Sequence, residues 1–194
     1  MAIQGASSGV GLMGLQIARF VGSTLVVGTA SHAGRRASLT DFGSHAVLDA
    51  NAADWADATA ELTDGRGFDV IIDMLSGQFA QRNLEVAAIE GRIVNVGRLA
   101  GERAELDLDL HAAKRITYVG VTFRSRSHDE TREINRRMQE DLGAAVASRK
   151  LALPIDRRFA FDDAAGAFTR MRANGHLGKI VLELGTPVAV PERT

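Results

Sequence analysis

The sequence predicts an α/β fold: a doubly wound (Rossmann), mostly parallel sheet with helices on both faces. Short apolar segments alternate with helix-like segments from the first residue onward, which is the pattern of repeated βα units. Most of the apolar segments lack a polar face, as strands buried on both sides of a parallel sheet do. With 194 residues, the chain is long enough for one domain with a normal core.

The first predicted strand is only about four residues long, although this topology puts it at the centre of the sheet, where about five or six residues are usual. This short strand indicates that the chain starts late within its fold. One domain is predicted over residues 1–185, and the proline-containing segment 186–194 is predicted to be a loose tail. The predicted strands cover residues 1–4, 25–29, 46–48, 68–73, 91–97, 116–123 and 178–184, with a short extended piece at 155–159.

Helical patterns are predicted to fill the connections between these strands. Gly43 is placed to end one of the helices as a C-cap, and Asp162 is the predicted N-cap of the last one. Asp107 and Asp109 are instead predicted to occupy alternate positions on one face of a strand. Besides the helix that follows the first strand, the helical patterns cover residues 34–42, 54–62, 78–88 and a long stretch that includes 134–145.

The composition excludes several classes of protein. The net charge of −1 gives no electrostatic attraction for nucleic acid or an anionic membrane. No apolar run reaches the roughly 18 residues of a membrane-spanning helix, and no secretion signal opens the chain. The absence of cysteine excludes disulfides and thiolate zinc sites, and the histidines have no metal-ligand spacing. We therefore predict a cytoplasmic protein without a metal site. The prevalence of Arg over Lys indicates a bacterial, GC-rich coding bias.

The stretch from Gly5 to Gly14 has the small residues of a nucleotide-binding turn between a strand and a helix. Such a turn lets backbone N–H groups and the helix N-terminus bind a pyrophosphate. In a first register, Gly9-Val10-Gly11-Leu12-Met13-Gly14 matches the dinucleotide fingerprint GxGxxG. A chain with 20 glycines produces such matches easily, and this register puts the last glycine a full turn inside the helix.

A second register, Gly5-xxx-Gly9-x-Gly11, resembles the pattern of short-chain dehydrogenases. That family needs a Tyr-x-x-x-Lys pair, in which the lysine lowers the pKa of the tyrosine. Tyr118 is the only tyrosine in this chain, and the residue four positions later is Thr122. The second register therefore fails on its chemistry.

A third register, Ala6-x-Ser8-x-x-Gly11, has small residues where the fingerprint has glycines. In this register the chain resembles the quinone-reductase branch of the medium-chain dehydrogenase/reductases, the relatives of zeta-crystallin. The resemblance extends from Ile3 to Leu184. The matching pieces, in their shared order, are Gly5–Gly11, Gln16–Arg19, Val27–Ser31, Asp73–Leu75, Gly91–Gly97, Val119–Thr122 and Gly178–Leu182.

The end of the second strand predicts which cofactor binds. An acidic residue that selects NAD is expected about 20 residues beyond the loop, but no carboxylate occurs there before Asp41. Ser31, Arg35 and Arg36 can instead bind the 2′-phosphate of NADPH. We therefore predict NADPH as the cofactor. The alternative is that the two arginines coat an exposed helix.

The resemblance also implies where the cofactor lies. Gly77 is expected near the adenine or its ribose. Many relatives carry a tyrosine just after the third strand, where this chain has Asp49-Ala50-Asn51 and departs from the family pattern. The residues expected to meet the pyrophosphate are Ser7, Ser8, Gly9, Val10 and Gly11, and those expected near the nicotinamide half are Gly97, Arg98, Val121, Thr122 and Phe123.

The activity implied by the resemblance is hydride transfer without zinc and without a dedicated acid–base residue. Hydride would pass directly from NADPH to a quinone or a conjugated enone, and the protein would orient the two. One alternative is a non-catalytic NADPH-binding module or partner subunit. Another is an enoyl reductase that acts on enoyl thioesters.

Two further expectations come from the same resemblance. The family has an N-terminal substrate domain, which has no counterpart in this sequence. The chain is therefore expected to be the nucleotide-binding half alone, with the other half upstream after a truncation or a late start, or absent through a real loss of the domain. Family members commonly form homodimers by pairing edge strands, and Ile116–Phe123 is the candidate edge. No nucleic acid or membrane is expected as a partner.

Overall fold

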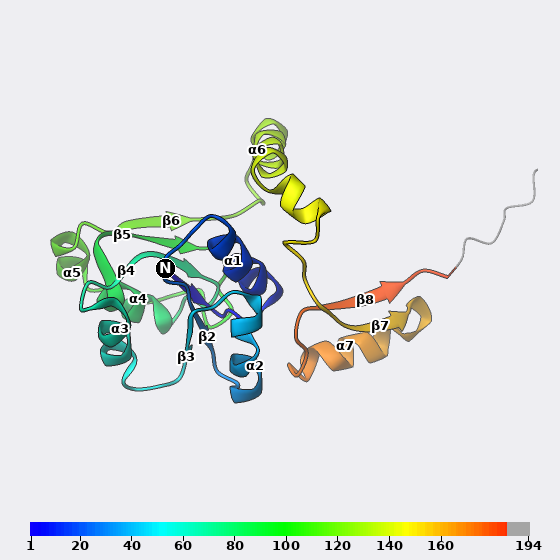
Figure 1. Cartoon of the computed structure of the whole chain (residues 1–194), viewed down its shortest axis with the longest axis horizontal. Coiled ribbons are helices and arrows are strands. Elements are labelled where there is room, and N and C mark those ends of the chain that lie inside the picture. Colours follow the sequence, from blue (N-terminus) through cyan, green and yellow to red (C-terminus); the bar gives the residue numbers. More distant parts are fainter. Residues whose placement is uncertain (186–194) are drawn as a thin grey trace, which may run out of the picture. The chain divides into compact units, whose positions relative to one another are not determined.

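The computed structural model describes residues 1–185, and the contacts within it form two compact units, the first over residues 1–152 and the second from residue 153 to the end of the described residues. The first unit contains a six-stranded parallel sheet with the strand order β3-β2-β1-β4-β5-β6 (Figure 1). The strands are β1 (Ala2–Gln4), β2 (Val27–Ala30), β3 (Ala46–Asp49), β4 (Phe68–Asp73), β5 (Ala87–Asn95) and β6 (Thr117–Gly120). The predicted doubly wound α/β fold is confirmed.

Strand β1 is the shortest of the six and lies at the centre of the sheet. Ala2 is the register partner of both Val27 in β2 and Ile71 in β4. All three residues of β1 are buried, which is why the segment has no polar pattern of its own. The central position expected for the first strand is confirmed.

Helices cover both faces of this sheet. Ala2 belongs to a core cluster with Trp55 and Leu84, which come from the helices on one face. Because neighbouring residues of a strand point to opposite faces, Ile3 lies on the other side, next to Gly14 of the first helix. The helices of this unit are α1 (Gly9–Phe20), α2 (Ala33–Ala37), α3 (Trp55–Thr63), α4 (Phe79–Val86), α5 (Leu108–Ala113) and α6 (His128–Ala147), with a short 3₁₀ helix η1 (Leu39–Phe42).

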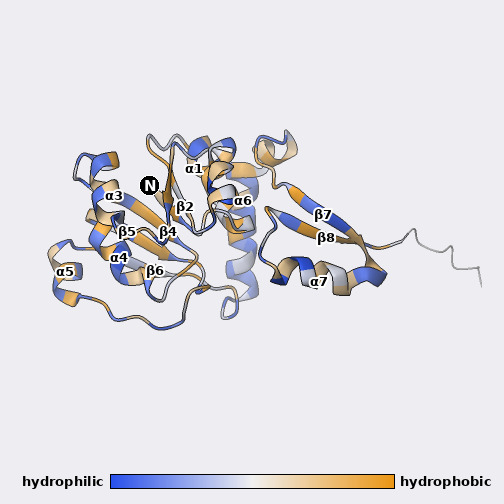
Figure 2. Cartoon of the chain, turned by 90° about the horizontal axis from the view of Figure 1, so that it is seen from below, coloured by the Kyte–Doolittle hydropathy of each residue, from blue (hydrophilic) through white to orange (hydrophobic). Residues whose placement is uncertain are grey.

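The helices differ in how much of their surface the fold buries. In α1, the residues Leu12, Leu15 and Ala18 are buried, whereas Ala145 is the only residue of α6 that is fully buried. Figure 2 shows hydrophobic colour along the strands of the sheet and alternating hydrophilic and hydrophobic segments along α6. No helix among residues 1–185 has the length and apolar character needed to cross a membrane.

Several predicted boundaries are corrected by the structure. The helix predicted over residues 34–42 is split into α2 and η1, although it ends as predicted at Gly43, whose φ is +103°. The prediction of a strand at Asp107 and Asp109 is wrong. The Asp107 side chain accepts a hydrogen bond from the N–H of Leu110 and caps α5, and Asp109 lies in its first turn. A few alternating residues fit a short helix as well as a strand, so the capping carboxylate decides between them.

The second unit is described over residues 153–185. It contains β7 (Ile155–Ala160), η2 (Phe161–Asp163), α7 (Ala164–Arg172) and β8 (Lys179–Glu183), and β7 pairs with β8 in a separate two-stranded parallel sheet. Asp163, one residue after the predicted Asp162, caps α7 by accepting a hydrogen bond from Gly166 N at 3.2 Å. One domain can hold more than one compact unit, so the single domain over residues 1–185 stays a prediction. The predicted tail, 186–194, lies outside the described residues.

Candidate functional site

The turn between β1 and α1 is built to present backbone N–H groups. Gly5 has a φ of +68°, which starts the turn, and the N–H of Ser8 donates to Gly5 O at 3.0 Å. The Ser8 hydroxyl then accepts a hydrogen bond from Gly11 N at 3.0 Å, so Ser8 is the N-cap of α1. The next helical hydrogen bond runs from Leu12 N to Ser8 O.

Two consequences follow for an anion at this turn. The N–H groups at the first positions of α1, those of Gly9 and Val10, have no acceptor within the helix. The positive end of the helix dipole lies at the same place. A phosphate group fits these donors, and the small side chains around them leave room for it.

The space around two glycines distinguishes the three registers of the turn. A Cβ added to Gly11 would lie only 2.6 Å from Ala6 Cα and from Gly5 O. A Cβ added to Gly14 would meet the Ile3 side chain at 3.5 Å, which is ordinary contact. The glycine that allows α1 to approach the strand closely is therefore Gly11, as the third register predicts. The literal GxGxxG register assigns that task to Gly14, which does not perform it.

A network of buried polar side chains is hydrogen-bonded to the turn. Thr29 Oγ1 donates to Gln4 Oε1 at 2.8 Å, and Gln4 Nε2 donates to Asn83 Oδ1 at 2.8 Å. All three side chains have no exposed surface. Thr29 also accepts hydrogen bonds from the turn, through its backbone O from Ala6 N and through its hydroxyl from Gly5 N. We did not predict these three residues, although a polar residue in an otherwise apolar strand is a signal that could have indicated Gln4 and Thr29.

The loop after β4 is shaped by a buried carboxylate. Asp73 has no exposed surface, and its Oδ1 accepts hydrogen bonds from Leu75 N at 2.8 Å and Ser76 N at 2.9 Å. Its Oδ2 is buried without a hydrogen-bond partner within the described residues. Ser76 and Gly77 both have positive φ values, +56° and +54°. A non-glycine residue rarely adopts this conformation, so Asp73 holds the loop in a strained path.

This loop is joined to the loop after β5. The N–H of Ala100 donates to Leu75 O at 2.8 Å. A Cβ added to Gly77 would lie 2.8 Å from Ala100 O, and one added to Gly97 would lie 2.7 Å from Met74 O. Gly77 and Gly97 are therefore the positions at which the two backbones touch. The predicted site residues of these two loops belong to one closely packed piece.

The residues after β6 extend the same edge of the sheet. The N–H of Val121 donates to Asn95 O at 3.0 Å, which ties this segment to the end of β5. Thr122 and Phe123 are exposed, and so is Arg98 in the loop after β5. Tyr118, two residues before the strand ends, is half-buried. Burial, followed by the negative charge of Asp73, raises the pKa of its phenol above the usual value.

A guanidinium from α2 and a carboxylate from β3 meet at the end of β2. Arg36 Nη1 donates to Ala30 O at 3.1 Å and to Ser31 O at 3.0 Å. The same nitrogen pairs with Asp49 Oδ2 at 2.8 Å. Arg36 is thus fixed to the sheet and does not simply coat a helix, while Ser31 is exposed and Arg35 is partly buried.

Asp49 is the functional candidate that we missed. The predicted absence of a carboxylate rested on the residues that follow β2 in sequence, but Asp49 reaches the same place from the end of β3. Ala30 and Asp49 are register partners in the parallel pair β2–β3. The signal that could have found it is the equivalent position at the end of the neighbouring parallel strand.

All the predicted site residues lie at the carboxyl edge of the six-stranded sheet. They follow β1, β2, β4, β5 and β6, and ligands of open α/β sheets bind at this edge. Their individual contacts with a cofactor stay predictions.

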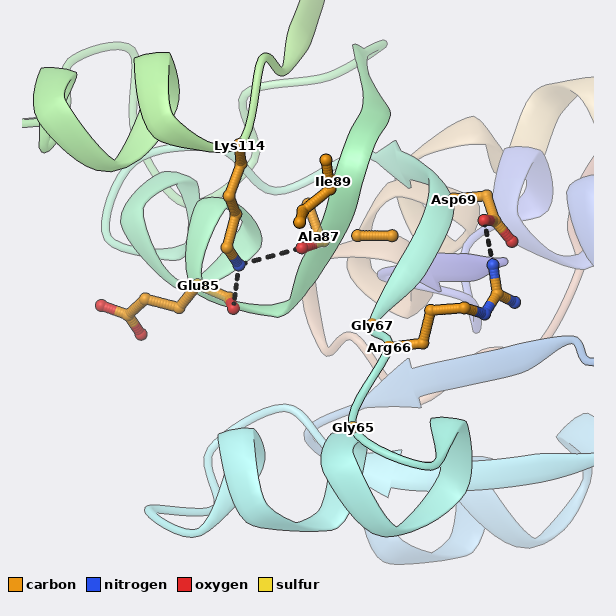
Figure 3. Close-up of a pocket in the computed structure, with 9 residues that line it drawn as sticks. Gly65, Arg66, Gly67, Asp69, Glu85, Ala87, Ile89 and Lys114 are labelled. Carbon is orange, nitrogen blue, oxygen red and sulfur yellow. Dashed lines mark hydrogen bonds and ion pairs between the residues drawn. The ribbon is translucent and has the colours of Figure 1, made fainter.

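A pocket of about 410 Å³ lies at the opposite, amino edge of the sheet (Figure 3). Its lining includes Gly67, just before β4, and Ala87, the first residue of β5. Lys114 Nζ donates to the carbonyl oxygens of Leu84, Glu85 and Ala87 at 2.7–3.0 Å. These contacts use all three N–H donors of the ammonium group and stabilise the C-terminal end of α4. Lys114 therefore has a structural role in the fold.

Metal ligands do not cluster in the part of the chain that the structure describes. Within residues 1–185 there is no group of three or more His, Cys, Asp or Glu residues that could hold a metal ion.

The fold and the turn define the class of protein, an α/β domain of the Rossmann type. The chain belongs to the zinc-binding dehydrogenase family, whose model matches residues 9–140, and so to the medium-chain dehydrogenase/reductase superfamily. The predicted resemblance is confirmed at this level.

Three similar proteins show the range of this family. A phenolphthiocerol/phthiocerol polyketide synthase of Mycobacterium tuberculosis is 31% identical over 183 residues, which cover 94% of this chain and 8% of that protein. Quinone oxidoreductase of Pseudomonas aeruginosa is 28% identical over 91% of this chain and 54% of its own length. The solved structure of the ER cyclopropanase CurF, from the curacin A biosynthetic pathway, superposes with a TM-score of 0.73 at 27% identity, covering 94% of this chain and 53% of that one. The chain thus spans about half of the quinone oxidoreductase and a small part of the polyketide synthase.

Proposed function

We propose that this chain binds NADPH and supports the direct transfer of hydride from it to a quinone or a conjugated enone, without zinc. The observation that carries the proposal is the turn at α1, in which Ser8 caps the helix and Gly11 allows its close approach. A quinone oxidoreductase is among its relatives. When bound, the nicotinamide supplies the hydride, and the protein's part is to orient the cofactor and exclude competing reactions.

The residues at the carboxyl edge have separate tasks in this proposal. The turn residues Ser7 to Gly11 bind the pyrophosphate, and Ser31 and Arg35 receive the 2′-phosphate. Gly77 lies at the adenosine half. The joined loops bring Gly97 and Arg98 to the nicotinamide half, and the residues Val121, Thr122 and Phe123 complete that end.

The chemistry requires no catalytic side chain from this chain. The bound cofactor would supply the hydride and water the proton that together convert a quinone into a hydroquinone. Independence from zinc is supported by the sequence, which has no cysteine, because thiolates are common ligands of zinc in dehydrogenases. A homodimer through β6 is part of the proposal, since β6 is one of the two edges of the sheet.

A second candidate function is an enoyl reductase that acts on enoyl thioesters. It is favoured by the similarity to a polyketide synthase at 31% identity and to the ER cyclopropanase CurF. A non-catalytic NADPH-binding module or partner subunit is the third possible function of the same site.

Binding and turnover separate these functions. NADPH and NADH are titrated into the purified chain by calorimetry, and NADPH oxidation is then followed at 340 nm with 1,4-benzoquinone or crotonyl-coenzyme A, with and without EDTA. Oxidation with the quinone in the presence of EDTA is the expected result. Oxidation with the thioester alone supports the enoyl reductase, tight binding without turnover supports the binding module, and equal affinity for NADH contradicts the choice of NADPH.

A further inference from the structure

Asp49 stands where the ribose of a dinucleotide is recognised. In Rossmann folds the end of the second strand faces the ribose 2′ position, whether it carries a hydroxyl or a phosphate. Asp49 ends β3 and is the register partner of Ala30, the last residue of β2. No carboxylate directly follows β2 in sequence. The carboxylate of Asp49, from the neighbouring strand, therefore lies beside the end of β2 in its place.

Both oxygens of this carboxylate are held in place. Asp49 Oδ1 accepts a hydrogen bond from Asn51 N at 2.9 Å, and Oδ2 pairs with Arg36 Nη1 at 2.8 Å. The same Nη1 contacts Ser31 O at 3.0 Å. One nitrogen atom thus connects the Asp49 carboxylate to Ser31, the residue proposed to meet the 2′ position.

The pair is open to a ligand. The side chain of Arg36 is 21% exposed and that of Asp49 is 36% exposed. Arg36 Nη1 already serves two carbonyl oxygens and Asp49, so a bound phosphate has to share this guanidinium with the carboxylate.

The two cofactors meet this pair differently. A 2′-phosphate carries a negative charge, which the Asp49 carboxylate repels and with which it competes for the positive charge of Arg36. A ribose hydroxyl of NADH is a hydrogen-bond donor, and a carboxylate is a good acceptor for it.

We propose that Asp49 is a specificity-determining residue that lowers the preference of this chain for NADPH over NADH. The inference rests on the proposed function, because it requires the cofactor to bind at this edge. Ser31, Arg35 and Arg36 attract the 2′-phosphate, and Asp49 opposes them. The preference of the native chain for NADPH over NADH is accordingly smaller than the one expected from the residues that follow β2.

The test is the ratio of the two dissociation constants, measured by calorimetry with NADPH and NADH on the full chain. Asp49→Asn keeps the shape of the side chain and removes its charge. It is expected to increase the preference for NADPH about fivefold, which is the size of a charge–charge effect at a partly exposed site. Asp49→Glu, which retains the charge, is expected to stay near the native ratio.

Asp109→Asn is the matched control. It removes the same charge from α5, which connects β5 to β6, the outer strand on the opposite side of the sheet from β3. This variant is expected to leave the ratio unchanged. Circular dichroism checks that each variant is folded, and Asp49→Ser replaces Asp49→Asn if the latter is not. A ratio within twofold of the native one in the neutral variant overturns the role of Asp49 while NADPH binding stands. Failure of the native chain to bind either cofactor overturns the proposed function and this inference together.

Discussion

The two edges of the six-stranded sheet use polar groups in opposite ways. At the amino edge, the ammonium group of Lys114 donates hydrogen bonds to three carbonyl oxygens at the end of α4. At the carboxyl edge, the first N–H groups of α1 have no acceptor within the helix, and Asp73 Oδ2 has no hydrogen-bond partner within the described residues. The pocket in Figure 3 is therefore part of the scaffold. The carboxyl edge, in contrast, retains polar groups without partners, which a ligand needs.

Backbone geometry does not separate the two edges in the same way, because Gly67, Glu90 and Arg115 at the amino edge also have positive φ. The carboxyl edge contains Ser76 and Gly77, both with positive φ, and close backbone contacts at Gly11 and Gly97. The difference between the two edges lies in their polar groups and not in backbone strain. Substitutions at the carboxyl edge are therefore expected to change cofactor binding, and those at the amino edge to change stability alone.

The largest effect is expected for Gly11→Ala. Its added methyl group would lie 2.6 Å from backbone atoms of Ala6 and Gly5, so α1 has to move away from β1. We expect a loss of about 2–3 kcal/mol in the free energy of unfolding, measured with urea, and at least a tenfold weaker binding of NADPH.

Gly14→Ala is the control for this prediction, because its methyl group meets only the Ile3 side chain at 3.5 Å. Alanine is the better helix former by about 1 kcal/mol, so this variant is expected to be as stable as the native chain or more so, with unchanged NADPH binding. Equal losses in the two variants would contradict the assignment of the turn to the Ala6, Ser8 and Gly11 register.

A smaller effect is expected at the amino edge. Lys114→Met keeps most of the length of the side chain but removes the three hydrogen bonds that hold the end of α4. The free energy of unfolding is expected to fall by about 1–2 kcal/mol, and the affinity for NADPH to remain as in the native chain. The exposed Lys150 provides the matched control, as Lys150→Met is expected to change neither quantity. A large loss of NADPH affinity in Lys114→Met would break the separation of the two edges.

Much of this arrangement follows from the sequence because it depends on local patterns. Buried parallel strands are apolar on both sides, so the strands and the turn before α1 are readable from the residues. Contacts between segments that are distant in sequence cannot be read from the residues in this way. Asp49 belongs to a different strand from the one that precedes Arg36, yet parallel pairing sets it opposite Ala30. Asn83 similarly reaches Gln4 only because α4 packs on the sheet.

The smallest effect concerns the ionisation of Tyr118, the only tyrosine of the chain. Its absorbance near 295 nm therefore reports one phenol. Burial, and then the charge of Asp73, raise its pKa above the usual value of 10.0, while the Ser76 side chain and Arg98 act in the other direction.

The sign of the effect on stability follows from this shift. Because the pKa is higher in the folded state than in the unfolded state, the contribution of Tyr118 is fully present below the unfolded pKa and is lost as pH rises through the folded pKa. A spectroscopic titration is expected to give a midpoint above 10, and Asp73→Asn is expected to lower it by removing the second cause. The exposed Asp109→Asn serves as the control and should leave the midpoint unchanged. A native midpoint at or below 10 would show that burial and the charge of Asp73 do not dominate the environment of this phenol.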